Sequence, residues 1–259
     1  MATCSPSIAA RAGTANSVDG SSGAFQCADE SAHYAFSVCM LLQQYREHIP
    51  WATEGVVELG SGDASAIADV VRSLPDLRVR GYDISPTSVD RARENIAARG
   101  VADRYIVELG DFFDQADSAA APRVSTAISN PPYIPAPDRD ILMPELWGGE
   151  YGNDLTLQLL KAEHEHVVVA VPSYADPVTT LATAADLGYR VVNFLAMGLD
   201  FGPYSSEPVV RRQIERICAE GRGWAGEDEY MVAIVLLTRD DALPGDRSAQ
   251  LMRSLQLRG

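Results

Sequence analysis

Positive charge is scarce in this sequence. Lys161 is the only lysine, and 21 Lys and Arg residues stand against 36 Asp and Glu residues, which leaves a net charge of −15 at pH 7. Such an excess of negative charge repels a phosphate backbone, and no basic stripe is present to bind one. We therefore expect no nucleic-acid partner.

Closely spaced cysteines and long apolar runs are also missing. Cys4, Cys27, Cys39 and Cys218 lie far apart and form no CxxC pair, so no disulfide framework is indicated. No apolar run approaches the ~20 residues of a membrane span. The first 22 residues lack the apolar segment of a signal peptide. We expect free thiols, no membrane partner and a cytoplasmic location.

The composition is that of a folded globular protein. Of the 259 residues, 46% are hydrophobic and 22% are charged, enough to bury a sizeable core. Residues 1–30 are rich in Ser, Ala and Gly, which predicts a flexible N-terminal arm or flap. We expect one domain at residues 31–239 and a C-terminal tail at residues 240–259. A homodimer remains open.

Strand and helix patterns alternate along the predicted domain. After a helix at residues 31–47, short β-branched runs are separated by segments with helical spacing. This order favours an α/β fold with a doubly wound, mostly parallel, seven-stranded sheet and an antiparallel last strand, whose ligand lies at the carboxyl ends of the strands. Residues 198–228 interrupt the last hairpin and are long enough to form a lid. The predicted strands are 55–59, 77–83, 105–109, 124–129, 166–171, 190–197 and 230–238, and the further predicted helices are 64–74, 86–99, 177–187 and 208–220.

A glycine turn follows the first predicted strand. Residues 58–63 read Glu-Leu-Gly-Ser-Gly-Asp, and the missing Cβ atoms of Gly60 and Gly62 let a ligand approach the amides that open a helix. The third glycine of a dinucleotide fingerprint is replaced by Ser65, which weakens the interpretation as an NAD site.

Acidic residues lie at the end of the second predicted strand and after the third. Asp83 comes 21 residues after Gly62, where a carboxylate can accept both hydroxyls of a ribose; an N-cap role is the alternative, although Ser85 fills it as well. Asp111 and Phe112 follow the third strand and form either an adenine contact or a simple turn. The pattern indicates an adenosine ligand. The candidate cofactor-binding residues are Glu58, Gly60, Ser61, Gly62, Asp83, Ile84, Asp111, Phe112 and Asn130.

The run Asn130-Pro131-Pro132-Tyr133 comes directly after the fourth predicted strand. The Asn130 side-chain oxygen and the Pro131 carbonyl can together accept both N–H groups of a planar amine, while Tyr133 stacks on its plane. This arrangement would orient a nitrogen for in-line attack on an electrophilic carbon, so that proximity supplies most of the acceleration. Asn130, Pro131 and Tyr133 are the candidate catalytic residues.

These motifs, in this order, resemble the class I S-adenosylmethionine (SAM)-dependent methyltransferases, specifically the subgroup with Asn-Pro-Pro-Tyr that acts on amide or exocyclic amine nitrogens. The resemblance covers roughly residues 50–239 and implies SAM as cofactor. It is strongest to the enzymes that methylate a glutamine amide in peptide release factors, which carry a similar Asn-Pro-Pro-Tyr-Ile-Pro run followed by paired glycines. Here these are residues 130–135 and Gly148-Gly149.

Three departures point away from a release factor as the substrate. About fifty residues replace the N-terminal helical domain of that family, residues 198–228 are enlarged, and the surface is acidic. We therefore expect a SAM-dependent N-methyltransferase that acts on an amine or amide of a small molecule or peptide under a closing lid. The candidate substrate-pocket residues are Trp147, Tyr174, Phe201 and Tyr204.

Two other hypotheses fit the same motifs. In a methyltransferase-like SAM cyclase of natural-product biosynthesis, the α-amino group of SAM attacks its own γ-carbon, which yields azetidine-2-carboxylate and methylthioadenosine. A non-enzymatic SAM-binding protein is disfavoured because binding alone needs no nitrogen clamp. We expect no metal site, since His164 and His166 lack further ligands at metal spacing.

Overall fold

The computed structural model describes residues 27–116 and 124–256. The chain divides into two compact units, Met1–Ser129 and Asn130–Gly259. Most of the predicted N-terminal arm lies outside the described residues. Its last residues belong to helix α1 (Ala28–Gln44), which begins three residues earlier than the sequence pattern predicts.

The first unit contains four parallel strands in the order β3-β2-β1-β4. At their carboxyl ends, Leu59 is in register with Tyr82 on one side and with Ser129 on the other. The strand order reverses between β1 and β4, and such a switch point is where open α/β sheets bind ligands. The strands are β1 (Val56–Leu59), β2 (Val79–Asp83), β3 (Tyr105–Leu109) and β4 (Thr126–Ser129), and the helices besides α1 are α2 (Trp51–Glu54), α3 (Ser65–Ser73), α4 (Pro86–Ala98) and α5 (Phe112–Ala116).

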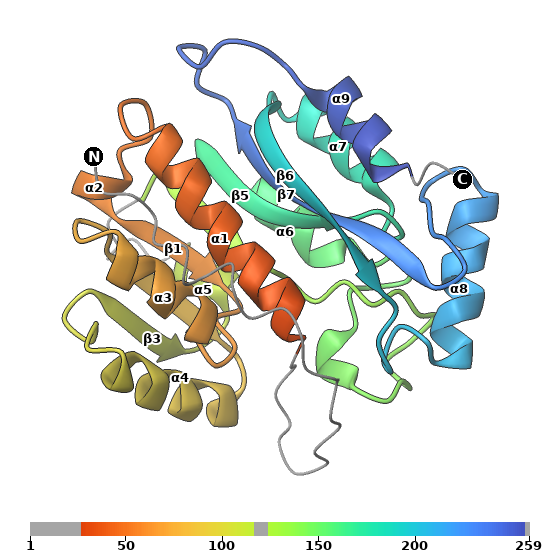
Figure 1. Ribbon diagram of the computed structural model, residues 1–259, viewed down its shortest axis with the longest axis horizontal. Helices are drawn as coiled ribbons and strands as arrows, with labels where there is room; N and C mark the ends of the chain where they lie inside the picture. Colours follow the sequence, from red (N-terminus) through yellow and green to blue (C-terminus); the bar gives the residue numbers. More distant parts are fainter. Residues whose placement is uncertain (1–26, 117–123, 257–259) are drawn as a thin grey trace. The chain divides into compact units, whose positions relative to one another are not determined.

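Local chemistry explains where these helices begin and pack. Ser85 caps α4 by accepting a hydrogen bond from the amide of Ser88 at 3.3 Å, and Pro86 occupies the first turn, where its missing N–H costs nothing. In α3, Ile67, Val70 and Val71 are buried. Figure 1 shows α1 lying beside α3, in agreement with the contacts between them.

The second unit contains β5 (His166–Pro172), β6 (Arg190–Asp200) and β7 (Glu229–Thr238), in the order β5-β7-β6. β7 runs antiparallel to both neighbours, as the sequence predicts. All residues of β5 are buried, which explains their continuous apolar run. The helices are α6 (Asp154–Lys161), α7 (Pro177–Asp186), α8 (Pro208–Ala219) and α9 (Ser248–Leu255).

Two parts of the second unit differ from the sequence-based prediction. The predicted C-terminal tail contains α9, whose Leu251 and Leu255 are buried and which packs on β6 and β7; Figure 1 shows this packing. β6 continues to Asp200, so the connection to β7, here called the lid, comprises residues 201–228. In the described part of the chain, no helix is both long and apolar enough to cross a membrane.

Candidate active site

The glycine turn leaves β1 with backbone angles that favour glycine. Gly60 and Gly62 have φ values of +72° and +55°, a left-handed region that other residues rarely adopt. A Cβ at either glycine would meet no atom within 4 Å. Open space next to the turn lets a ligand approach its backbone. Ser61, by contrast, is 8% exposed and lies against Gly81 of β2.

Asp83 holds this turn against the end of β2. Its Oδ2 accepts a hydrogen bond from the amide of Gly62 at 2.8 Å, and its Oδ1 accepts one from the amide of Ser85 at 2.9 Å. Burial raises the pKa of Asp83, and these two hydrogen bonds oppose the increase. Each carboxylate oxygen has a second lone pair, so the group can still accept a ribose hydroxyl. Ser85, and not Asp83, is the N-cap of α4. The role of Asp83 in this structure is the hydrogen bond to the Gly62 amide in the glycine turn.

The segment after β3 combines a capping carboxylate with a buried aromatic ring. Asp111 Oδ1 accepts the amide hydrogen of Phe113 at 2.8 Å, at the start of α5. The Phe112 ring packs edge-on against Tyr82 at 6.0 Å and is 3% exposed. Its side chain is therefore part of the core, whereas Ile84 is 72% exposed. Of the two apolar side chains among the predicted cofactor-binding residues, Phe112 and Ile84, only Ile84 is accessible.

Glu58 is buried beneath the turn. Its side chain is 3% exposed, and Oε2 accepts a short hydrogen bond from the hydroxyl of Tyr105. Burial raises the pKa of Glu58 to about 8, although hydrogen bonds from Tyr105 and Ser61 oppose the increase. The carboxyl group is therefore mostly protonated at neutral pH. Its side chain supports the turn from below, and it is not accessible for the direct cofactor contact that the sequence motif suggests.

We expect Glu58 to make stability decrease with rising pH. The folded state retains a proton that the unfolded chain, with a pKa of 4.5, releases. The stabilisation is complete below 4.5 and is lost as the pH approaches 8, by on the order of a few kcal/mol. Urea unfolding at pH 5.5 and pH 8 measures it. Glu58→Gln, which stays neutral, should flatten this dependence, and parallel pH profiles for the two proteins would contradict the assignment.

In the second unit, the Asn-Pro-Pro-Tyr run, here called the NPPY loop (residues 130–133), directly follows Ser129 of β4. The 148–154 segment supports it. Ile134 donates its amide hydrogen to the Leu146 carbonyl at 2.9 Å and accepts one from Gly148 at 3.0 Å. A Cβ on Gly148 would lie 2.6 Å from the Tyr133 Cα, and one on Gly152 would lie 2.5 Å from the Tyr133 carbonyl oxygen. Only glycine permits these approaches.

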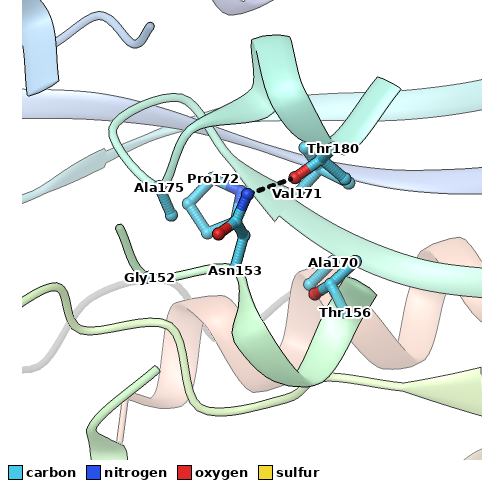
Figure 2. A pocket seen from close by; sticks show the side chains of 8 residues that line it. All are labelled: Gly152, Asn153, Thr156, Ala170, Val171, Pro172, Ala175 and Thr180. Carbon is cyan, nitrogen blue, oxygen red and sulfur yellow. Dashed lines mark hydrogen bonds between the residues drawn. The ribbon is translucent and has the colours of Figure 1, made fainter. Parts of the chain in front are cut away.

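The 148–154 segment is itself fixed to β5 and α7. Figure 2 shows the Asn153 side chain directed at Thr180, to whose Oγ1 it donates a hydrogen bond at 3.1 Å. It also donates to the Asp176 carbonyl at 3.3 Å. Asn153 and Thr180 line a small pocket together with Gly152 and Ala175. This packing gives the NPPY loop a rigid base.

Aromatic rings gather behind Tyr133. Tyr174 lies 5.9 Å from Tyr133, 5.8 Å from Phe201 and 4.8 Å from Tyr230, measured between ring centroids. The Tyr133 and Tyr230 hydroxyl oxygens are 3.3 Å apart. Tyr230 was not predicted as a site residue; its position at the start of β7, after the lid, is the signal that could have identified it.

The other two predicted pocket residues do not join this cluster. Trp147 donates its indole N–H to the Ala136 carbonyl at 2.9 Å, and the Arg139 guanidinium lies 5.0 Å above its ring. Tyr204 lies in the lid and is half-buried. Within the described residues, no group of three or more His, Cys, Asp or Glu side chains could hold a metal ion.

Sequence comparison relates the chain to nitrogen methyltransferases. No protein-family model matches it. A release factor glutamine methyltransferase of Cereibacter sphaeroides is 38% identical over 100 residues, which are 38% of this chain and 34% of the relative. A tRNA1(Val) (adenine(37)-N6)-methyltransferase of Porphyromonas gingivalis is 30% identical over 93 residues, which are 34% of this chain and 36% of the relative. The chain thus spans about a third of the length of these relatives.

Structural comparison identifies the fold. A Pyrococcus horikoshii protein whose solved structure is described as an RNA methyltransferase superposes with a TM-score of 0.51 and 14% identity, over 83% of this chain and 85% of that one. This confirms the predicted Rossmann-like α/β methyltransferase fold. By sequence and fold, the chain resembles the class I SAM-dependent methyltransferases, and in sequence the release factor glutamine methyltransferases among them.

Proposed function

We propose that this protein is a SAM-dependent N-methyltransferase that acts on an amine or amide nitrogen of a small molecule or peptide. The observation that carries the proposal is the NPPY loop, placed directly after β4 and held by three close glycine contacts. This close packing fixes the backbone of the loop, and a fixed backbone is what orienting a reacting nitrogen requires.

The first unit would bind the cofactor. The open glycine turn and Asp83 offer backbone amides and a ribose acceptor, and the exposed Ile84 offers an apolar surface. Bound SAM supplies an electrophilic methyl carbon. Asn130 is covalently joined to Ser129, whose register partner Leu59 immediately precedes the turn.

The NPPY loop would hold the acceptor nitrogen. The Asn130 Oδ1 atom and the Pro131 carbonyl oxygen accept its two N–H groups, which fixes the nitrogen lone pair toward the methyl carbon. As the N–C bond forms, the C–S bond breaks, and the nitrogen loses one proton to solvent. No strong base is needed, because the acceptors stabilise the positive charge that develops on the nitrogen.

One alternative is a SAM cyclase, in which aromatic faces would stabilise the sulfonium cation. Of the clustered rings, Tyr133, Tyr174 and Tyr230 are 7%, 0% and 4% exposed, whereas Phe201 is half-buried and is the ring that a ligand can reach. The same clamp could then hold the α-amino group of SAM, which attacks the γ-carbon as the bond from that carbon to sulfur breaks. Azetidine-2-carboxylate and methylthioadenosine would leave, with loss of one proton.

Incubation with SAM followed by mass spectrometry tests both functions. The first arm contains SAM alone, and the others add small amines and amides, a glutamine-containing peptide, or an RNA, because one relative is named as a tRNA methyltransferase. S-adenosylhomocysteine with an acceptor heavier by one methyl group supports N-methylation. Methylthioadenosine with a cyclic four-carbon amino acid supports the cyclase. SAM left intact in every arm would refute the proposed activity.

Asp83→Ala should weaken SAM binding by about 10²-fold, because it removes both the ribose acceptor and the bond that holds the Gly62 amide. Isothermal titration calorimetry measures the dissociation constant. Asp103→Ala is a matched control, since this exposed aspartate lies between α4 and β3. Equal affinity of the two variants would remove Asp83 from the site.

A further inference from the structure

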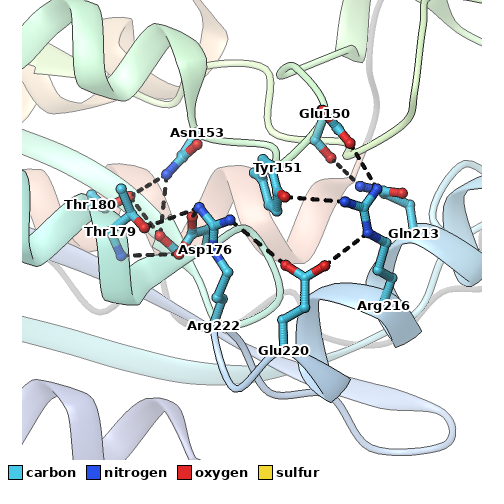
Figure 3. A network of polar contacts seen from close by, with 10 residues as sticks. All are labelled: Glu150, Tyr151, Asn153, Asp176, Thr179, Thr180, Gln213, Arg216, Glu220 and Arg222. Carbon is cyan, nitrogen blue, oxygen red and sulfur yellow. Dashed lines mark hydrogen bonds and ion pairs between the residues drawn. The ribbon is translucent and has the colours of Figure 1, made fainter.

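A polar network joins the lid to the 148–154 segment. Figure 3 shows two arginines from α8 and the loop after it reaching toward Glu150 and Tyr151. These contacts lie within the second unit and outside the residues assigned above to cofactor or nitrogen binding. We call them the lid network; its members are Glu150, Tyr151, Asp176, Arg216, Glu220 and Arg222.

Arg222 fastens the end of the lid to the start of α7. Its guanidinium forms a short ion pair with Asp176, whose side chain is fully buried, and donates to Thr179 Oγ1 at 3.1 Å. The same guanidinium lies 3.7 Å from the centroid of the Tyr151 ring. Asp176 has φ of +46° and caps α7 through the Thr179 amide. The Tyr151 ring is thus stacked on the Arg222 guanidinium, which Asp176 holds in place.

Arg216 of α8 binds Glu150 and Tyr151. It donates to Glu150 Oε1 at 2.8 Å and to the Tyr151 hydroxyl at 3.3 Å, and its Nε donates to Glu220 at 2.9 Å. Gln213, one turn earlier, donates to the Glu150 carbonyl at 2.8 Å. Side chains of α8 therefore bind both the backbone and the side chains of residues 150 and 151.

Glu150 and Tyr151 lie between Gly148 and Gly152, the two glycines that pack on the NPPY loop. A Cβ on Gly152 would lie 2.5 Å from the Tyr133 carbonyl oxygen. The backbone of this turn therefore packs closely on Tyr133, and a displacement of the turn toward the NPPY loop would disturb Tyr133. Contacts run without a break from α8 to the NPPY loop.

We propose that Arg216 and Arg222 are positioning residues, which set the NPPY loop through Tyr151 only while α8 is docked. The position of α8 in the lid then determines the conformation of the NPPY loop. An acceptor that fixes the lid in the docked position also places the NPPY loop for nitrogen binding. The exposed ion pairs of Arg216 contribute little to stability on their own. Their consequence is geometric, since a misplacement of about 1 Å can cost about 10²-fold in rate.

Fluorine NMR tests this coupling without any assay of activity. The chain contains three tryptophans, and 5-fluorotryptophan labels them all. The Trp147 indole donates to the Ala136 carbonyl, and Trp147 forms a bridge with Ile134, the residue after the NPPY loop. Trp51 lies in the first unit and serves as internal reference. Single Trp→Phe variants assign the resonances.

Arg222→Met and Tyr151→Leu should each shift or broaden the Trp147 resonance and leave that of Trp51 unchanged. Tyr151→Leu is the safer variant, because it leaves no buried charge unpaired, whereas Arg222→Met isolates Asp176. Tyr151→Phe keeps the stacked ring and should retain most of the wild-type spectrum. Arg190→Ala is the matched control, since Arg190 pairs with exposed Asp241 in the same unit. An unmoved Trp147 resonance in both disruptive variants would overturn the coupling.

The kinetic arm rests on the proposed function and separates the two claims. In the assay that consumes SAM, Tyr151→Leu should lower kcat by about 10²-fold, change the SAM dissociation constant less than about twofold, and be largely rescued by Tyr151→Phe. If the wild-type protein turns over no acceptor, the proposed function fails while the NMR result still decides the coupling. A shifted Trp147 resonance with unchanged kcat would overturn the positioning role.

Discussion

Replacing Asn130 with alanine should reduce turnover by about 10²- to 10⁴-fold while SAM binds almost as before. The Asn130 oxygen would accept one N–H of the reacting nitrogen, so its loss leaves that nitrogen free to rotate away from the line of attack. The cofactor contacts proposed here reside mainly in the first unit and remain intact. Single-turnover kinetics with mass spectrometry measures the rate, and calorimetry measures SAM binding.

Asn130→Asp is the informative companion to this variant. Aspartate keeps a side-chain oxygen that accepts an N–H hydrogen bond and has nearly the same shape. We expect it to retain more activity than Asn130→Ala by at least about tenfold. If Asn130→Ala turned over as fast as the wild-type protein, other residues would have to hold the nitrogen, and the NPPY loop would have only a structural role.

Gly148→Ala should destabilise the protein by about 2–4 kcal/mol and abolish activity in the folded fraction. The added methyl group would lie 2.6 Å from the Tyr133 Cα and 2.7 Å from the Pro132 carbonyl oxygen. Both are backbone atoms that cannot swing aside, so the NPPY loop must move. Urea denaturation gives the free energy of unfolding, and the SAM-consuming assay gives the activity.

Gly202→Ala makes the same chemical change in the same unit, where a Cβ meets no atom within 4 Å. Its unfolding free energy should stay within about 0.5 kcal/mol of wild type. Similar stabilities of the two alanine variants would mean that the NPPY loop does not rest on Gly148 as described.

The elements that frame the candidate site could largely be predicted from sequence. β3 has the predicted bounds of residues 105–109, and β2 ends at the predicted Asp83. The strands next to the candidate site end at or just before Gly, Asp or Pro residues. The backbone preferences of these residues depend on the local sequence, so they can be recognised without the tertiary structure. The order of motifs along the chain was therefore sufficient to indicate the fold and the expected cofactor.

Features that depend on residues distant in sequence could not be predicted. The burial of Glu58 needs Tyr105, 47 residues later, and the motif alone makes Glu58 look like a ligand contact. The lid network joins Tyr151 to Arg222 across 71 positions, and no periodicity signals that pairing. α9 was missed for a different reason: Leu251 and Leu255 have helical spacing, but a helix of eight residues is too short to show a repeating pattern.

The lid departs from and returns to neighbouring positions of one hairpin. Asp200 at the end of β6 is in register with Glu229 at the start of β7, and the Phe201 amide donates to the Asp228 carbonyl at 2.9 Å. The ends of the insertion are thus already held together, so a longer or shorter segment adds little loop-closure entropy. A segment of different length can therefore replace residues 201–228 without a change in the sheet, and a chimera with another segment there tests whether these residues determine substrate choice.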